Sequence, residues 1–212
     1  MRSHSGLFVV FEGCDGAGKS TQLRLLANSL REQLPQQQIV CTREPGGTLL
    51  GSRIRELLLH GSDVAPRAEA LLYAADRAQH YAEVIMPALA AGSIVLQDRY
   101  IDSSIAYQAG ARGLSEEWIY ELSAAVTEGT TPDLTVLLDF DPALRGERIA
   151  HREEAEDRIE CETLAFHTSV AETFRRLATK APERYLLVDA TAPIAEINRL
   201  VVAKVNDILA TS

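Results

Sequence analysis

Short apolar runs alternate along the chain with longer segments that carry apolar residues at helical spacing. The short runs are rich in β-branched and aromatic residues and predict strands over residues 7–12, 38–42, 93–97, 134–139 and 184–189. The longer segments predict helices over residues 19–34, 50–59, 66–91, 115–127, 142–150, 161–179 and 193–210. Strands that alternate with helices favour an α/β fold with a five-stranded parallel sheet between helical layers.

Prolines mark several expected helix boundaries. Pro66, Pro142 and Pro193 stand where three of the helices should begin, because proline is well tolerated in the first helical turn. Pro87 lies inside the third helical pattern, where it predicts either a kink or an early end of the helix. The chain has 212 residues and no repeat or linker, so we expect a single domain over residues 1–212.

A glycine-rich segment joins the first predicted strand to the first predicted helix. Residues 13–20, GCDGAGKS, fit the P-loop pattern GxxxxGK[ST] in the strand–loop–helix context that the motif requires. Backbone N–H groups of such a loop bind phosphate oxygens, while Lys19 reaches the β and γ phosphates and Ser20 supplies a hydroxyl to Mg²⁺. The residues expected to contact ATP are Gly13, Cys14, Asp15, Gly16, Ala17, Gly18, Lys19, Ser20 and Thr21.

The fold class is therefore expected to be the three-layer fold of P-loop NTPases, with ATP and Mg²⁺ as its ligands. The alternative is a glycine-rich turn that binds nothing. Asp15 stands out inside the loop, because a carboxylate beside phosphates is unfavourable unless it faces a hydroxyl or a metal-bound water. We therefore expect Asp15 to face an acceptor molecule.

The formal net charge of -9 argues against general binding to nucleic acid or to an anionic membrane. The three cysteines are widely spaced, without a CxxC pair, so neither a disulfide framework nor a zinc site is suggested. The apolar run over residues 7–11 is too short for a membrane span or a signal-peptide core. A reducing cytoplasm is the simplest expected location.

Charged residues follow the second and third predicted strands, where a parallel sheet binds its ligands. Arg43 lies in the turn TREPGGT at residues 42–48, and Asp98 and Arg99 follow the third strand. Asp98 is placed like the carboxylate that holds Mg²⁺ in P-loop enzymes, and the two arginines could hold a second phosphate. The alternatives are a structural ion pair between Asp98 and Arg99, and a turn role for Arg43.

Tyr73 and Arg77 are four residues apart in a predicted helix and so lie on one face of it. A base could stack on the ring and accept hydrogen bonds from the guanidinium group. The alternative is a ring at the edge of the core beside a solvated charge.

Taken together, these motifs resemble the thymidylate kinase family. The resemblance is carried by residues 11–20, 42–48, 71–77 and 98–100 and is extended by residues 107–108 and 157–160. The seven residues of TREPGGT are far more specific than the P-loop alone.

The resemblance implies phosphorylation of dTMP to dTDP with Mg-ATP, which supplies dTTP synthesis, and it implies a homodimer. By the same resemblance, Arg43 and Arg99 would hold the acceptor phosphate, and Asp15 would meet the 3′-hydroxyl. Tyr107 would crowd the 2′ position and so favour deoxyribose. Tyr73 would stack on thymine, Arg77 would hydrogen-bond the base, and Gln108 would help to close the base pocket.

Members of this family whose P-loop lacks an arginine bring catalytic basic residues from a lid over ATP. Ala17 occupies the variable loop position here, and the corresponding lid covers residues 141–158. It is more acidic than the strongly basic lids of this branch, although Arg145, Arg148 and Arg152 are spaced to share one helical face. The resemblance favours Arg148 and Arg152, with Lys19 and Arg99, as the catalytic residues; the alternative is a solvated helix of Glu–Arg pairs.

Two other functions stay open. A nucleotide kinase with a different acceptor would share the P-loop and the arginines. A catalytically silent P-loop protein that binds nucleotide and regulates a partner would bind ATP without forming dTDP.

Overall fold

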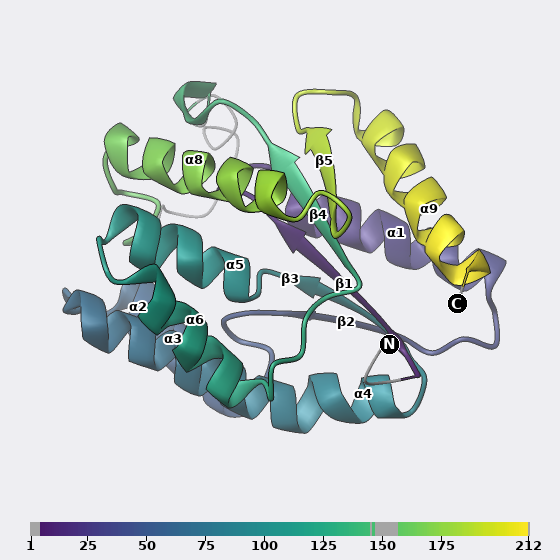
Figure 1. Cartoon of the computed structure of the whole chain (residues 1–212), viewed down its shortest axis with the longest axis horizontal. Helices are drawn as coiled ribbons and strands as arrows, with labels where there is room; N and C mark the ends of the chain where they lie inside the picture. Colours follow the sequence, from purple (N-terminus) through teal and green to yellow (C-terminus); the bar gives the residue numbers. More distant parts are fainter. Residues whose placement is uncertain (1–4, 145, 147–156, 212) are drawn as a thin grey trace.

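The fold is built around one parallel sheet, seen in a computed structural model that describes residues 5–144, 146 and 157–211 (Figure 1). The strands are β1 (Leu7–Glu12), β2 (Ile39–Arg43), β3 (Ile94–Asp98), β4 (Leu134–Asp139) and β5 (Tyr185–Asp189). They lie in the order β2-β3-β1-β4-β5, and every neighbouring pair is parallel. All five predicted strands are confirmed to within one residue at each end.

Helices cover both faces of this sheet, as expected for right-handed crossovers. The helices are α1 (Lys19–Gln33), α2 (Leu49–His60), α3 (Pro66–His80), α4 (Met86–Ala90), α5 (Ile101–Ser104), α6 (Glu116–Val126), α8 (Leu164–Lys180) and α9 (Ile194–Ala210). Helices α1 and α9 lie together on one face, and α3 to α6 and α8 lie on the other (Figure 1). The three-layer architecture predicted from the sequence is thereby confirmed.

The helix predicted over residues 66–91 is divided into three pieces. It begins at Pro66 as expected, but α3 ends at His80 and a π-helical segment, η1 (Tyr81–Ile85), leads into α4. Pro87 lies in the first turn of α4, where its missing N–H costs little. The α-helix therefore ends early, at His80, but the chain continues along a helical path through η1 into α4.

Two other helices differ from the prediction. Helix α8 begins at Leu164 and not at residue 161, because the Thr163 hydroxyl accepts a hydrogen bond from the Phe166 N–H and caps it there. The helix predicted over residues 142–150 starts as a single 3₁₀ turn, η3 (Pro142–Leu144), and most of its remainder lies outside the described residues.

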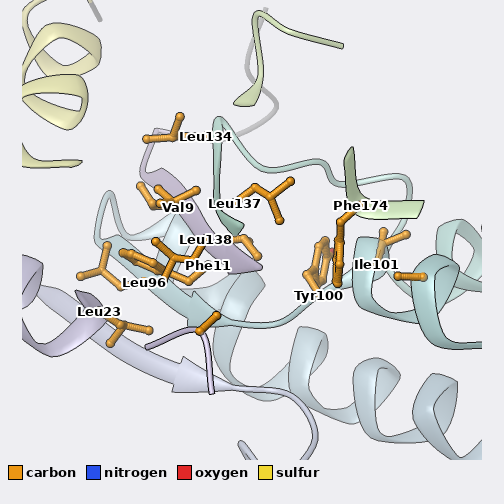
Figure 2. Packing of buried hydrophobic residues seen from close by; sticks show 14 of the residues in the cluster. Val9, Phe11, Leu23, Leu96, Tyr100, Ile101, Leu134, Leu137, Leu138 and Phe174 are labelled. Atoms are coloured by element: carbon orange, nitrogen blue, oxygen red, sulfur yellow. The ribbon is translucent and has the colours of Figure 1, made fainter. Parts of the chain in front are cut away.

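The central strands β1 and β4 are almost wholly buried, and their side chains form the middle of the core. Figure 2 shows Val9 and Phe11 of β1 beside Leu137 and Leu138 of β4, with Leu23 of α1 nearby. Burial on both faces explains why these strands read as continuous apolar runs in the sequence. Within the described residues, no helix is long and apolar enough to span a membrane.

Candidate active site

The P-loop runs between β1 and α1 at the carboxyl edge of the sheet. Gly13 has φ +134, and a Cβ atom there would lie 2.4 Å from the Leu138 carbonyl oxygen of β4, so only glycine fits. Lys19 is buried, and its Nζ donates to the Gly13 and Cys14 carbonyl oxygens at 3.0 and 2.9 Å. Burial and the nearby Arg99 guanidinium lower the pKa of Lys19. The loop therefore has the geometry of a phosphate cradle closed by an ammonium group.

Ser20 and Asp98 meet beside this loop. The Ser20 hydroxyl donates to Asp98 Oδ2 at 2.7 Å, and Asp98 is held in register between Phe11 of β1 and Arg43 of β2. In the part of the chain that the structure describes, the buried Oδ1 of Asp98 has no hydrogen-bond partner. A hydroxyl and a carboxylate with a spare oxygen fit Mg²⁺, which takes few protein ligands and completes its shell with phosphates and water.

Arg99 joins the P-loop to the residues after β3. It has φ +66, and its guanidinium group contacts Asp15 Oδ1 at 2.5 Å, the Gly13 carbonyl oxygen at 3.2 Å and the Ser103 hydroxyl at 3.1 Å. The Tyr107 hydroxyl donates to the other Asp15 oxygen at 3.0 Å. Although burial alone would raise the pKa of Asp15, Arg99, Lys19 and Tyr107 outweigh it and hold that pKa below its ordinary value.

Two cavities meet at this ion pair. One, of about 320 Å³, is lined by P-loop residues with Lys19, Ser20, Arg43 and Asp98. The other, of about 90 Å³, is lined by Tyr73, Arg77, Tyr107 and Gln108 among others. Asp15 and Arg99 line both, so the two cavities are neighbours across that ion pair.

The smaller cavity brings together the predicted base-binding residues, and Arg77 is the most constrained of them. Its Nε donates to Glu44 Oε2 at 2.8 Å, and its other nitrogens donate to the hydroxyls of Ser123 and Ser104 and to the Tyr100 carbonyl oxygen. Arg77 is buried, so it is not the solvated charge of the alternative interpretation. Arg43, by contrast, is exposed at the mouth of the larger cavity.

Two residues that shape the site, Arg55 and Glu12, were given no role in the sequence analysis. Arg55 of α2 lines both cavities, although nothing distinguished it from the other arginines of that helix. Glu12 is fully buried and accepts hydrogen bonds from the Tyr100 N–H and from the Ser103 hydroxyl, at 2.8 and 2.5 Å. Burial and the neighbouring Asp102 raise the pKa of Glu12 to about 7. Its partners Tyr100 and Ser103 lie 88 and 91 positions away, so no local pattern could indicate these contacts.

The proposed lid is described only at its two ends. Arg148 and Arg152, the expected catalytic arginines, lie outside the described residues, as does Arg145. At the returning end, Arg158 donates to the Leu58 carbonyl oxygen at 2.9 Å and to Glu69 at 2.6 Å. The segment after residue 156 is therefore anchored to α2 and α3.

A P-loop at the carboxyl edge of a five-stranded parallel sheet, beside a second cavity, defines a P-loop nucleotide-binding α/β protein. The family model for thymidylate kinase matches residues 11–201 of this chain. The chain belongs to the thymidylate kinase family.

Individual relatives agree over nearly the full length. The thymidylate kinase of Bifidobacterium longum subsp. infantis is 50% identical over 210 residues, which cover 97% of this chain and 88% of that protein. The thymidylate kinase of Deinococcus radiodurans is 48% identical, over 95% of this chain and 97% of that protein. The crystal structure of thymidylate kinase from Ehrlichia chaffeensis superposes with a TM-score of 0.79 at 32% identity, covering 95% of this chain and 98% of that one.

Proposed function

We propose that this protein phosphorylates dTMP to dTDP, with Mg-ATP as the phosphoryl donor, and so supplies dTTP synthesis. Membership of the thymidylate kinase family supports the reaction. The observation that carries the assignment to this site is the pair of neighbouring cavities that share Asp15 and Arg99. A donor phosphate on the P-loop and an acceptor phosphate beyond Arg99 would then face each other, as in-line transfer requires.

On the donor side, the P-loop backbone from Gly13 to Thr21 would bind the ATP phosphates. Lys19 would bridge the β and γ phosphates, and its contact with two loop carbonyl oxygens supports that position. Ser20 and Asp98 would hold Mg²⁺, directly or through water, in agreement with the spare Asp98 oxygen. When bound, Mg²⁺ would neutralise charge that develops on the phosphates.

On the acceptor side, Arg99 would bind the dTMP phosphate, and exposed Arg43 could turn toward it from the mouth of the cavity. Asp15 would accept a hydrogen bond from the 3′-hydroxyl, because the low pKa of its carboxyl group keeps it ionised. Tyr107 lies against both Asp15 and Arg99 and would crowd the 2′ position of a ribose.

The base would enter the smaller cavity. Tyr73 lines its wall and would stack on the thymine ring, while Arg77 would donate to a carbonyl oxygen of the base. Gln108 lines the same cavity and would complete the polar edge of the pocket. Phosphoryl transfer through a loose transition state needs alignment and positive charge more than a strong base, so Lys19 and Arg99, with Arg148 and Arg152 of the lid, could act as the catalytic residues.

The experiment that tests this function is a substrate panel. Purified protein is incubated with Mg-ATP and each of dTMP, dUMP, dCMP, dGMP and UMP, and ADP and the nucleoside diphosphate are followed together. We expect dTMP to give the highest kcat/KM and one dTDP for each ADP. Preference for another acceptor would reject the base assignment, and ATP binding without product would favour a silent nucleotide-binding regulator.

We further propose that the protein forms a homodimer and that it is located in a reducing cytoplasm. Exposed leucines on the neighbouring helices α2 and α3, such as Leu50, Leu57 and Leu71, support an apolar interface with a second copy. Sedimentation equilibrium should give twice the mass of one chain, and Leu57→Glu should shift it toward the monomer. A wild-type monomer at micromolar concentration would reject the dimer.

The free thiols of Cys14, Cys41 and Cys161 support the cytoplasmic location, which cell fractionation would test.

A further inference from the structure

A fully buried carboxylate, Glu69, stands behind the smaller cavity in the first turn of α3. Its Oε1 accepts a hydrogen bond from Gln108 Nε2 at 3.0 Å, and its Oε2 accepts one from Arg158 at 2.6 Å. Arg112 donates to both oxygens at 3.4 Å. Glu69 belongs to none of the sequence motifs, yet it contacts a residue that lines the cavity.

The two arginines hold this carboxylate in one place. Arg158 is fixed in turn by the Leu58 carbonyl oxygen, which accepts from its Nε, and by its backbone N–H, which donates to the Leu59 carbonyl oxygen at 3.1 Å. Arg112 is also paired with Glu162 at 2.6 Å. Because each arginine has a second anchor, Glu69 presents its Oε1 to Gln108 from a fixed position.

That position decides how the Gln108 amide is turned. A carboxylate that is paired with two arginines accepts hydrogen bonds and donates none, so only the NH₂ group of the amide can face Glu69. The amide oxygen is bonded to the same carbon as the NH₂ group and points in a different direction, away from Glu69. Gln108, in the π-helical segment η2 (Ile105–Ala111), lines the cavity together with Tyr73 and Arg77. Gln108 would therefore offer the cavity an acceptor, and the second N–H of Arg77 Nη1, which has no hydrogen-bond partner among the residues that the structure describes, would offer it a donor.

We propose that Glu69 is a positioning residue for base selection, which acts by holding the Gln108 amide oxygen toward the base. An acceptor at this place suits a pyrimidine whose ring nitrogen carries a proton, as in thymine and uracil. It opposes cytosine, whose unprotonated ring nitrogen would face it with a second lone pair. The inference rests on the proposed function, because it assumes that a nucleoside monophosphate binds with its base in this cavity.

Glu69→Gln is the variant that tests the proposal. A glutamine at position 69 can donate as well as accept, so Gln108 can turn over and offer its NH₂ group to the base. We expect the ratio of kcat/KM for dTMP to kcat/KM for dCMP to fall by about tenfold or more, with KM for dTMP raised more than kcat is lowered. Glu69→Asp keeps a group that only accepts and should retain the ratio of the wild type.

The matched control is Glu162→Gln. It makes the same chemical change on the other side of Arg112 but leaves Gln108 untouched, so it should keep the discrimination ratio. A variant that merely loosens the fold would lower the melting temperature and not the ratio. In a Gln108→Leu background, Glu69→Gln should cause no further loss of discrimination, because the group through which it acts is absent.

An unchanged ratio in folded Glu69→Gln, or an undiminished effect of that change in the Gln108→Leu background, would overturn the proposal. If Glu69→Gln does not fold, a crystal structure of the wild type with dTMP decides instead. Gln108 should then contact Glu69 and the thymine ring nitrogen at once, and a Gln108 that has left Glu69 would overturn the proposal. Wild-type protein without preference for dTMP would reject the proposed function itself. The wild-type assay therefore distinguishes failure of the proposed function from failure of the role proposed for Glu69.

Discussion

Asp76 illustrates how one buried side chain can set the response of this protein to pH. It is fully buried; its Oδ1 accepts from the Gly46 N–H at 3.0 Å, and its Oδ2 has no hydrogen-bond partner in the described residues. Burial, and then the nearby Glu44 carboxylate, raise the pKa of Asp76 to about 6. The folded state therefore binds a proton here at a pH where the unfolded chain has already lost it.

The sign of the effect follows from that difference. Between the unfolded pKa of 3.8 and the folded pKa of about 6, the native state holds more protons, so its stability falls as pH rises through this window. Asp76→Asn removes the titration and keeps an acceptor for Gly46. We expect it to raise the free energy of unfolding, relative to the wild type, by about 3 kcal/mol at pH 7.5 and by much less at pH 4.

Urea unfolding of both proteins at several pH values measures this difference. Glu12 also has a raised pKa, but it is present in both proteins and cancels in the comparison. Asp63 is exposed, so Asp63→Asn is the control for the loss of one acidic side chain. A constant difference for Asp76→Asn would show that its ionisation does not oppose folding.

At the scale of elements, the P-loop depends on the close approach of β4. A Cβ atom on Gly13 would meet the Leu138 carbonyl oxygen at 2.4 Å, in addition to the strain of a positive φ. Gly113 also has a positive φ, but a Cβ atom on Gly113 would have no described atom within 4 Å of it apart from its chain neighbours. Gly113→Ala therefore measures strain alone, and Gly13→Ala measures strain together with the contact.

We expect Gly13→Ala to lower the free energy of unfolding by about 2 kcal/mol more than Gly113→Ala does. It should also weaken ATP binding, because the loop must move away from β4 to make room. Thermal unfolding and titration calorimetry with ATP check the two parts. Equal costs for both variants, with unchanged ATP affinity, would contradict the geometric argument.

At this scale, the sequence predicts a helix or strand when the interactions that form it lie within that helix or strand. The five strands and most helices were predicted because their apolar runs, periodicity and prolines lie within the element itself. The helical residues from Ile101 to Ala111 were not predicted, since their order comes from distant partners. Glu12 accepts hydrogen bonds from the backbone N–H groups of Tyr100 and Ser103 and so fixes the start of this segment.

The same reasoning applies to the candidate site. The P-loop, Asp98 and Arg99 could be predicted from short motifs, because each lies at the carboxyl end of its strand or directly after it. Tyr73 and Arg77 were found at helical spacing, but the contacts of Arg77 with Glu44, Ser104 and Ser123 span up to 46 positions. The supporting role of Glu69 is non-local in the same way, so it emerged only from the fold.

At the scale of the whole molecule, most of the positive charge that lines the larger cavity comes from residues outside the P-loop. The cations that line the larger cavity are Lys19, Arg43, Arg55 and Arg99, and all except Lys19 come from outside the P-loop. Position 17 of the loop is alanine and adds no charge on the donor side. In a loose transition state, negative charge develops on the ADP oxygen that leaves the γ phosphorus, and we propose Arg148 and Arg152 of the lid as cations that offset this charge.

Arg152→Ala should lower kcat by about 100-fold or more, while KM for dTMP changes little, because the acceptor site lies beyond Arg99. Exposed Arg24 on α1 lines neither cavity, so Arg24→Ala is the control for loss of one arginine. Single-turnover kinetics with Mg-ATP and dTMP separates the chemical step from product release. If Arg152→Ala and Arg148→Ala both retain full kcat, the acidic lid is a solvated helix and Lys19, Arg99 and Mg²⁺ must stabilise the transition state by themselves.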